Sequence, residues 1–166
     1  MGGVERDMLT PPTVAVIGGG QLARMMQESA IALGINLRAL VEAEDGSTGL
    51  VTVDKAVGAP KDLDAVRALI DGADVLTFEH EHIPAQTMEE AARVVSVQPP
   101  AAALLYAQDK LQMRVRLSEM GIPCPAWARV DNAAELERFG AVIGWPLIVK
   151  TPRGGYDGHG VAVGHS

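Results

Sequence analysis

The sequence predicts an α/β fold in which a parallel sheet is followed by the start of a second domain. Short apolar, β-branched runs alternate with segments whose apolar residues recur at helical spacing. Strands separated by helices indicate parallel pairing through right-handed crossovers. Hydrophobic residues make up 48% of the 166-residue chain and charged residues 21%, so a sizeable core can form and global disorder is excluded.

The first hundred residues carry five predicted strands. Residues 13–17 form a continuous apolar run, as expected of a strand buried on both faces. A helix follows and ends at Gly34, with apolar or small residues at helical spacing: Leu22, Met25, Met26, Ser29, Ala30 and Leu33. The next predicted elements are strands at 36–41 and 55–57, a helix at 62–70, a strand at 74–78, a helix at 84–93 and a strand at 94–97.

The motif QPP at residues 98–100 interrupts this pattern, because two prolines do not fit inside a helix or a central strand. We therefore expect a flexible arm at 1–12, a first domain at 13–107 and the truncated start of a second domain at 108–166. A helical stretch is predicted over 101–120, interrupted near Gln108 or Asp109. Strands at 126–130 and 146–150, a helix at 132–139 between them and a last short strand complete the prediction. The chain is expected to be an amino-terminal part of a longer protein.

The charge and cysteine content narrow the class of protein. The 14 basic and 21 acidic residues give a formal net charge of −7, which argues against nucleic acid as a partner. Cys124 is the single cysteine, so no intrachain disulfide can form, and we expect it to be structural. No apolar run approaches the ~18 residues of a membrane span, and the first residues do not resemble a signal peptide. A cytoplasmic protein with no membrane partner is expected.

The segment VAVIGGGQLARMM at residues 14–26 is typical of a phosphate cradle. Glycines between a strand and a helix let backbone N–H groups approach an anion at the helix N-terminus. Gly18, Gly20 and Ala23 also fit the dinucleotide fingerprint, and Glu42 follows about 20 residues on, where such domains keep a ribose-binding acid. An NAD(P)-binding oxidoreductase is therefore one hypothesis, and a tight turn without ligand is another.

A second candidate segment, TFEHEHIP at residues 77–84, follows a predicted buried strand. Ligands bind beyond the carboxyl ends of parallel strands, so Glu79 and Glu81 are placed to accept hydrogen bonds from one. His80 and His82 raise the possibility of a metal site, but strand alternation would turn the two imidazoles away from the two carboxylates. A solvated loop is the remaining alternative.

The most specific segment is PLIVKTPRGGYDGHGVAV at residues 146–163. A strand presents Lys150, and a loop with Gly154, Gly155, Gly158 and Gly160 leads to another strand. Such a loop can fold over the phosphates of a nucleotide and offer amide donors, and Lys150 can add a compact charge. It is not a Walker A loop, because no G-K-[ST] follows. The polar residues of the loop suit a second ligand: Arg153, Tyr156, Asp157 and His159. A mobile hairpin without function is the alternative.

Lys110 is a candidate for a second phosphate contact. It lies in the segment AQDKLQMRVRLSEMGIPCP, just before the glycine-loop region. The plainer interpretation of this segment is an amphipathic helix with a solvated basic side.

Taken together, GGGQLARM, TFEHEHIP, AQDKLQMRVRL, GIPCP and IVKTPRGGYDGHGV resemble, in order and spacing, the N5-carboxyaminoimidazole ribonucleotide synthetase family of ATP-grasp ligases. The resemblance covers residues 14–163. It implies a Rossmann-like pre-ATP-grasp domain followed by the beginning of an ATP-grasp domain, and a role in purine (IMP) biosynthesis. The implied reaction carboxylates 5-aminoimidazole ribonucleotide with bicarbonate at the expense of ATP through carboxyphosphate, with Mg²⁺. The family's tendency to dimerise implies a homodimer.

The resemblance also implies roles for individual residues. ATP binding falls on Lys110, Lys150, Gly155, Tyr156, Asp157, Gly158, His159, Gly160 and Val161. Substrate binding falls on Gly19, Gly20, Gln21, Leu22, Glu79, Tyr156, Asp157 and His159. Asp157 and Tyr156 are the implied catalytic residues, with Asp157 accepting a hydrogen bond from the substrate amine and helping to remove its proton. The Mg²⁺ ligands are expected beyond Ser166, with none in this chain.

Two departures from the family pattern stand out. His159 replaces the usual Lys or Arg, so an imidazole stands where the family has a permanent cation, and Ala23 replaces a common Gly. As it stands, this chain is not expected to catalyse the whole reaction. The alternatives are another ATP-grasp ligase, such as the formate-dependent glycinamide ribonucleotide transformylase, the oxidoreductase, and a non-catalytic nucleotide-binding module.

Overall fold

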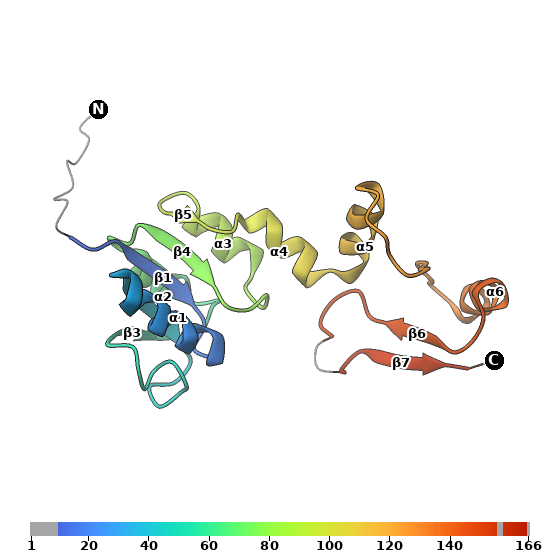
Figure 1. Ribbon diagram of the computed structural model, residues 1–166, viewed down its shortest axis with the longest axis horizontal. Coiled ribbons are helices and arrows are strands. Elements are labelled where there is room, and N and C mark those ends of the chain that lie inside the picture. The colour runs from blue at the N-terminus through green and yellow to red at the C-terminus, as the bar shows by residue number, and fades with distance from the viewer. Residues whose placement is uncertain (1–9, 156–157, 166) are drawn as a thin grey trace. The chain divides into compact units, whose positions relative to one another are not determined.

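The computed structural model describes residues 10–155 and 158–165. The chain divides into two compact units, Met1–Ala101 and Ala102–Ser166 (Figure 1). Each unit has its own sheet, and the two sheets differ in kind.

The first unit is built on a five-stranded parallel sheet with strand order β3-β2-β1-β4-β5. In chain order the strands are β1 (Thr13–Ile17), β2 (Asn36–Val41), β3 (Asp54–Val57), β4 (Val75–Phe78) and β5 (Ser96–Val97). At the centre of the sheet, Val16 lies opposite Ala39 of β2 and Thr77 of β4. The predicted parallel α/β class is confirmed. From β1 the chain adds β2 and β3 on one side and then β4 and β5 on the other, so the topological switch point of the sheet lies between β1 and β4.

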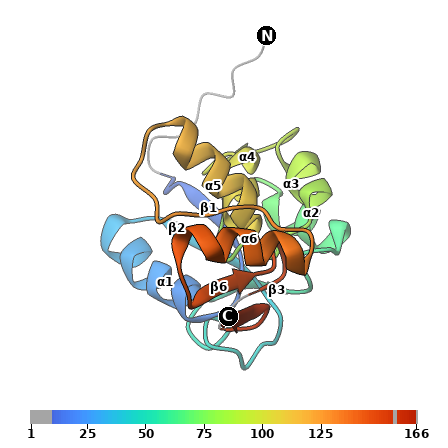
Figure 2. The same ribbon diagram turned by 90° about the vertical axis from the view of Figure 1, so that its right-hand side faces the viewer.

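Three helices connect these strands: α1 (Gln21–Leu33), α2 (Leu63–Ile70) and α3 (Ala85–Ala91). Figure 2 shows α1 on one side of the sheet and α2 and α3 on the other. This follows from right-handed crossovers, because the chain moves in one direction from β1 to β2 and in the other from β3 through β4 to β5. Gly34 ends α1 in a left-handed conformation at φ 66°, as predicted. Asp62 caps α2 through the N–H groups of Asp64 and Ala65.

The core of the first unit is aliphatic. Its largest fully buried side chains are Ile17, Leu40, Leu69, Leu76, Ile83 and Met88. The apolar stripe that predicted α1 is only partly core, because Leu22, Met25 and Leu33 are 57%, 55% and 72% exposed. Its buried residues are Ala23 and Ala30. Small side chains let the helix approach the sheet closely, and the larger ones flank it.

The second unit begins within α4 (Ala101–Gln108) and contains α5 (Lys110–Glu119), α6 (Ala133–Ile143) and an antiparallel pair, β6 (Leu147–Lys150) and β7 (Val161–Gly164). The predicted break near Gln108 or Asp109 is confirmed, since Asp109 separates α4 from α5 and caps the latter. Helix α6 lies beside the hairpin (Figures 1 and 2). Trp145 packs against Gly140 so closely that a Cβ there would lie 2.3 Å from the indole ring.

The predicted strand at 126–130 is wrong, because that segment has no regular secondary structure. An apolar run becomes a strand only where a neighbouring strand offers backbone partners, and β6 pairs with β7 instead. The Trp127 ring N–H donates a hydrogen bond to Ser118 Oγ at 3.1 Å. The predicted strand at 94–97 is also shortened, to the two residues of β5. Among the described helices, none combines the length and apolar character needed to cross a membrane.

Replacement of Leu76 by alanine tests the core of the first unit. Leu76 lies in β4 and is fully buried, so we expect Leu76→Ala to lower the free energy of unfolding by about 2–5 kcal/mol. Leu50→Ala is the matched control, because Leu50 is 68% exposed, and its effect should stay within about 0.5 kcal/mol. Urea denaturation followed by far-UV circular dichroism measures both losses. Tryptophan fluorescence would not report on the first unit, because both tryptophans lie in the second unit. Equal losses for the two variants would contradict this assignment of the core.

Candidate functional site: two glycine-rich segments anchored by carboxylates

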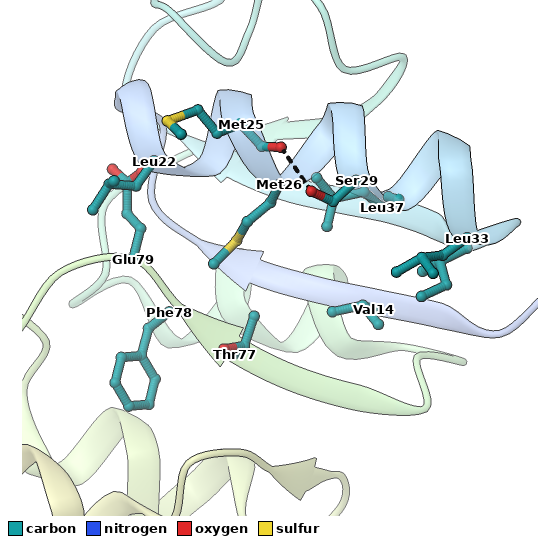
Figure 3. Close-up of a pocket in the computed structure, with 12 residues that line it drawn as sticks. Val14, Leu22, Met25, Met26, Ser29, Leu33, Leu37, Thr77, Phe78 and Glu79 are labelled. Atoms are coloured by element: carbon teal, nitrogen blue, oxygen red, sulfur yellow. Dashed lines mark hydrogen bonds between the residues drawn. The ribbon is translucent and has the colours of Figure 1, made fainter.

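The glycine turn after β1 is occupied by a carboxylate of the protein itself. Glu79, directly after β4, accepts a hydrogen bond from Gly20 N–H at Oε1 and from Ala23 N–H at Oε2, each at 2.7 Å. Figure 3 shows Glu79 rising from the end of β4 toward the amino-terminal end of α1. Because β1 and β4 are neighbours, the structure brings together two segments 59 residues apart in sequence.

The glycines in this turn make room for that carboxylate. Gly18 has φ 138°, and a Cβ there would lie 2.1 Å from Glu79 Cγ. At Gly20 a Cβ would lie 2.6 Å from Glu79 Oε1. Gly20 supplies no side-chain cap to α1, so Glu79 provides the negative charge that the helix N-terminus favours. The turn therefore already holds an anion, and the amides of Gly20 and Ala23 are not presented to a pyrophosphate. This arrangement argues against the dinucleotide-binding hypothesis, although Glu42 is exposed after β2.

A loop after β2 supports the turn from the other side. Thr48 is fully buried, and its Oγ1 donates to the Gly20 carbonyl at 2.7 Å. Its backbone N–H donates to the Gly19 carbonyl at 3.1 Å. Ser47 Oγ donates to Gln21 Oε1 at 2.8 Å. No sequence pattern singles out Ser47 and Thr48, because a hydroxyl residue in a polar loop carries no signal of its own.

The HEH sequence after Glu79 does not form a metal site. The alternation of side chains that a strand would impose does not apply to residues 80–82, because β4 ends at Phe78. His82 N–H donates to His80 Nδ1 at 3.1 Å, and His82 Nε2 lies 3.6 Å from Glu81 Oε1. Among the residues that the structure describes, no group of three or more His, Cys, Asp or Glu side chains is placed to hold a metal ion.

An apolar groove of about 520 Å³ lies beside α1 in the first unit. Leu22, Met25 and Leu33 line it from the helix, and Thr77, Phe78 and Glu79 from the end of β4 (Figure 3). The groove reaches the Glu79 carboxylate at one end, so a molecule bound to Glu79 would meet aliphatic side chains next to it.

The second glycine-rich segment connects Lys150, the last residue of β6, to Val161, the first of β7. Its neck is closed by a hydrogen bond from Thr151 N–H to the Gly160 carbonyl at 2.8 Å. A Cβ on Gly155 would lie 2.6 Å from the His159 carbonyl oxygen, and one on Gly160 would lie 2.3 Å from Thr151 Oγ1. Both positions thus require glycine. Lys150, Gly158 and His159 are exposed, whereas Tyr156 and Asp157 lie outside the described residues.

The start of α5 anchors the near side of this loop. Lys110 donates from its backbone N–H to the Pro152 carbonyl at 2.8 Å and from Nζ to the Gly155 carbonyl at 2.7 Å. Asp109 Oδ2 accepts a hydrogen bond from Arg153 Nε at 2.9 Å. The structure therefore places Lys110 beside the loop, with its ammonium group on a loop carbonyl, and its contact with a phosphate stays a prediction.

Asp109 is held in its charged form by these contacts. The hydrogen bond from Gln112 N–H lowers the pKa of the Asp109 carboxyl most, followed by the hydrogen bond and the charge of Arg153. The N–H of Leu111 lowers the pKa further, and burial opposes the shift. The net effect keeps the pKa of Asp109 below its ordinary value of 3.8.

Comparison with known proteins defines the class to which these features belong. A family model described as the ribonucleotide synthetase preATP-grasp domain matches residues 12–108. A second one, described as the ATP-grasp domain, matches residues 115–166. The chain belongs to the ribonucleotide synthetase preATP-grasp family and continues into an ATP-grasp domain.

Within this class, the chain is similar to N5-carboxyaminoimidazole ribonucleotide synthases. It is 48% identical over 151 residues to the one from Mycobacterium bovis, covering 90% of this chain and 35% of that protein. A structure of an N5-carboxyaminoimidazole ribonucleotide synthetase in complex with ADP superimposes with a TM-score of 0.85 at 28% identity, over 98% of this chain and 43% of the other. The Aspergillus clavatus enzyme in complex with ADP and 5-aminoimidazole ribonucleotide gives a TM-score of 0.78 at 34% identity, over 87% and 39%. The chain thus spans little more than a third of the curated relative's length.

Glu79→Gln tests the anchoring of the first turn. The glutamine amide oxygen can accept only one of the two backbone N–H groups, and its NH₂ group then faces the other N–H, donor against donor. We therefore expect the free energy of unfolding to fall by about 1–3 kcal/mol. Urea denaturation followed by circular dichroism measures the loss. Glu89→Gln is the control, because Glu89 is an exposed residue of α3, and it should have little effect. If both variants matched the parent protein, the anchoring role of Glu79 would be wrong.

The lowered pKa of Asp109 predicts a pH dependence in the second unit. Because the folded-state pKa lies below the unfolded-state value, the unfolded chain binds more protons in that range. The stabilisation is complete above about pH 5 and is lost as the pH falls through the unfolded and then the folded pKa. Fluorescence of Trp127 and Trp145, both in the second unit, reports its unfolding by urea at each pH. We expect Asp109→Asn to flatten the acid loss, and Asp131→Asn, an exposed control, to leave the profile unchanged. An unaltered slope for Asp109→Asn would contradict the assignment.

Proposed function

We propose that the protein carrying this chain is an ATP-grasp carbon–nitrogen ligase that carboxylates 5-aminoimidazole ribonucleotide with bicarbonate, in purine biosynthesis. The observation that carries the proposal is the glycine loop after Lys150, closed at its neck and tied to α5. It occurs in a chain 48% identical, over both units, to a synthase named for this product. The family resemblance of the motifs on each side of the loop supports the same conclusion.

The proposed ATP site is in the second unit. Lys150 at the end of β6 supplies a positive charge, and the backbone of residues 155–161 supplies N–H donors to the phosphates. The loop fits this role because Gly158, at φ 86°, has open space where a Cβ would be. Lys110 can exchange the Gly155 carbonyl for a phosphate oxygen, since both are acceptors. Bicarbonate oxygen would take the γ-phosphoryl group of ATP, giving ADP and carboxyphosphate, whose carboxyl group then passes to the 5-amino nitrogen as phosphate leaves.

The proposed substrate contact in the first unit is Glu79 with the turn Gly19, Gly20, Gln21 and Leu22. Each Glu79 oxygen accepts one backbone hydrogen bond and has a further lone pair for a hydroxyl or amine donor. The site therefore suits the donor groups of a ribonucleotide better than its phosphate. Tyr156 and Asp157 are proposed as catalytic on the resemblance alone, with Asp157 receiving the proton that leaves the amine. His159 would supply a hydrogen bond to the same substrate.

Several finer points belong to the same proposal. We place the arm at 1–12, the substrate-binding domain at 13–107 and the ATP-grasp portion at 108–166, which agrees in outline with the matched residues 12–108 and 115–166. Magnesium is the metal that such a ligase would use. The residues that the structure describes include no group of three or more His, Cys, Asp or Glu side chains placed to hold a metal ion, and we propose that the magnesium ligands lie beyond Ser166. A homodimer and a cytoplasmic location complete the proposal.

The whole protein provides the direct test. With 5-aminoimidazole ribonucleotide and bicarbonate both present, we expect it to release phosphate from ATP well above the rate seen when either is omitted. Replacing them with formate and glycinamide ribonucleotide tests the transformylase alternative. ATP hydrolysis stimulated by formate and glycinamide ribonucleotide, and not by bicarbonate and 5-aminoimidazole ribonucleotide, would overturn the proposed substrate in favour of the transformylase reaction. Saturable binding of NADH, lost in Glu42→Ala, would instead restore the oxidoreductase hypothesis.

Lys150→Ala tests the proposed ATP site within that protein. Loss of one charge-assisted contact to a phosphate is worth about 1.5–3 kcal/mol, so kcat/KM for ATP should fall by roughly 10- to 150-fold. Steady-state kinetics with varied ATP and saturating co-substrates measure the change. Lys61→Ala removes an exposed lysine of the first unit and should leave kcat/KM unaltered. A similar small effect in both variants would count against Lys150 as a phosphate ligand.

A further inference from the structure

We propose that Asp109 and Arg153 form a positioning pair that holds the near side of the glycine loop in place for the phosphates of ATP. The proposal rests on the function proposed above. It assigns to both side chains a role that neither the motifs nor the comparisons give them: Arg153 is a tether for the loop, and Asp109 is the point to which it is tied.

Asp109 is a fixed point because its carboxylate is itself held by a helix. Oδ1 accepts the N–H groups of Leu111 and Gln112 at 3.0 Å each, which are unpaired donors of the first turn of α5. This leaves Oδ2 for Arg153 at 2.9 Å. The Asp109 side chain is only 12% exposed, whereas that of Arg153 is 59% exposed. The carboxylate is thus buried and hydrogen-bonded at both oxygens, and the arginine reaches it from the loop.

Three contacts then connect Asp109 and Lys110, at the start of α5, to three residues of the loop. Besides the ion pair, Lys110 binds the Pro152 carbonyl through its backbone and the Gly155 carbonyl through Nζ. Gly154, between these points, has φ 73°, a conformation that glycine adopts without strain. A segment rich in glycine has high conformational entropy when it is free. Tying residues 152–155 to α5 removes much of that freedom before a nucleotide binds.

The ion pair also limits how far the positive charge of Arg153 can attract phosphate. Its Nε is engaged by a carboxylate that keeps its negative charge, so the pair is close to neutral as a unit. A guanidinium in that position holds the loop, and the attraction of phosphate falls mainly to Lys150 and the loop amides. Breaking the pair should therefore weaken ATP binding through a loosened loop, with a smaller effect on the chemical step once ATP is bound.

The test measures loop protection and kinetics in the full-length protein. The variants are Asp109→Asn, Arg153→Gln and the double variant, with Arg116→Gln as the control, because Arg116 pairs with Glu119 in an exposed position on the same helix. We expect amide hydrogen exchange in residues 151–161 to rise about three- to tenfold in each single variant. The KM for ATP should rise by a similar factor, with kcat changed less than twofold. A pair acting as a unit predicts that the double variant loses no more than either single variant.

The outcomes separate the two proposals. If the wild-type protein shows substrate-dependent ATP hydrolysis but the variants keep its KM and exchange rates, the positioning pair is overturned and the function stands. Additive losses in the double variant, or a fall in kcat alone, also overturn it. If the wild-type protein hydrolyses no ATP with 5-aminoimidazole ribonucleotide and bicarbonate, the proposed function is overturned, and the proposed role of the pair in positioning the loop for ATP is overturned as well. Because Asp109→Asn also weakens the α5 cap, Arg153→Gln, an exposed change, decides the result should Asp109→Asn fail to fold by tryptophan fluorescence.

Discussion

The hydrogen bonds from Gly20 and Ala23 to the Glu79 carboxylate organise the first unit. They join the ends of β1 and β4 at the switch point of the sheet, and they orient α1 by satisfying its amino terminus. They also explain the glycines, since side chains at Gly18 or Gly20 would occupy the space of Glu79. Thr48 completes the arrangement by binding the Gly20 carbonyl from the β2 side. Four segments of the chain thus meet at one turn, and the groove beside α1 ends there.

Local patterns were enough to predict most of the elements but not the contacts between them. The apolar run of β1, the helix starts near Asp62 and Asn132 and the break at Asp109 all depend on neighbouring residues, so the sequence reveals them. The bond between Glu79 and Gly20 depends on which strands are neighbours. Both residues were singled out, but as separate ligands for a substrate. The strand prediction at 126–130 is wrong for the same reason, because an extended segment forms a strand only where a partner strand lies beside it.

The exposed stripe on α1 has a related cause. Helical spacing shows that a face is apolar, but not whether another element covers it. Here α2 and α3 both lie across the sheet from α1 (Figure 2), so within the described residues of this unit no helix stands beside α1 above β4 and β5. Leu22 and Met25 therefore line a groove beside α1. Sheet topology, which periodicity cannot supply, sets this difference.

The two glycine-rich segments use the same device with opposite electrostatic results. In each, a carboxylate caps a helix and binds the glycine-rich segment: Glu79 caps α1 and binds Gly20 N–H, and Asp109 caps α5 and binds Arg153 of the loop. At the first turn the carboxylate covers amide donors, so the surface it leaves is rich in acceptors. At the second, Arg153 and Lys110 are bound to Asp109 and to a loop carbonyl, and the exposed Lys150 leaves a positive charge beside the loop. Acceptors suit hydroxyl and amine groups, whereas donors and cations suit phosphate. The first glycine turn, which by sequence alone resembles a phosphate cradle, is thus the less suited of the two to bind one.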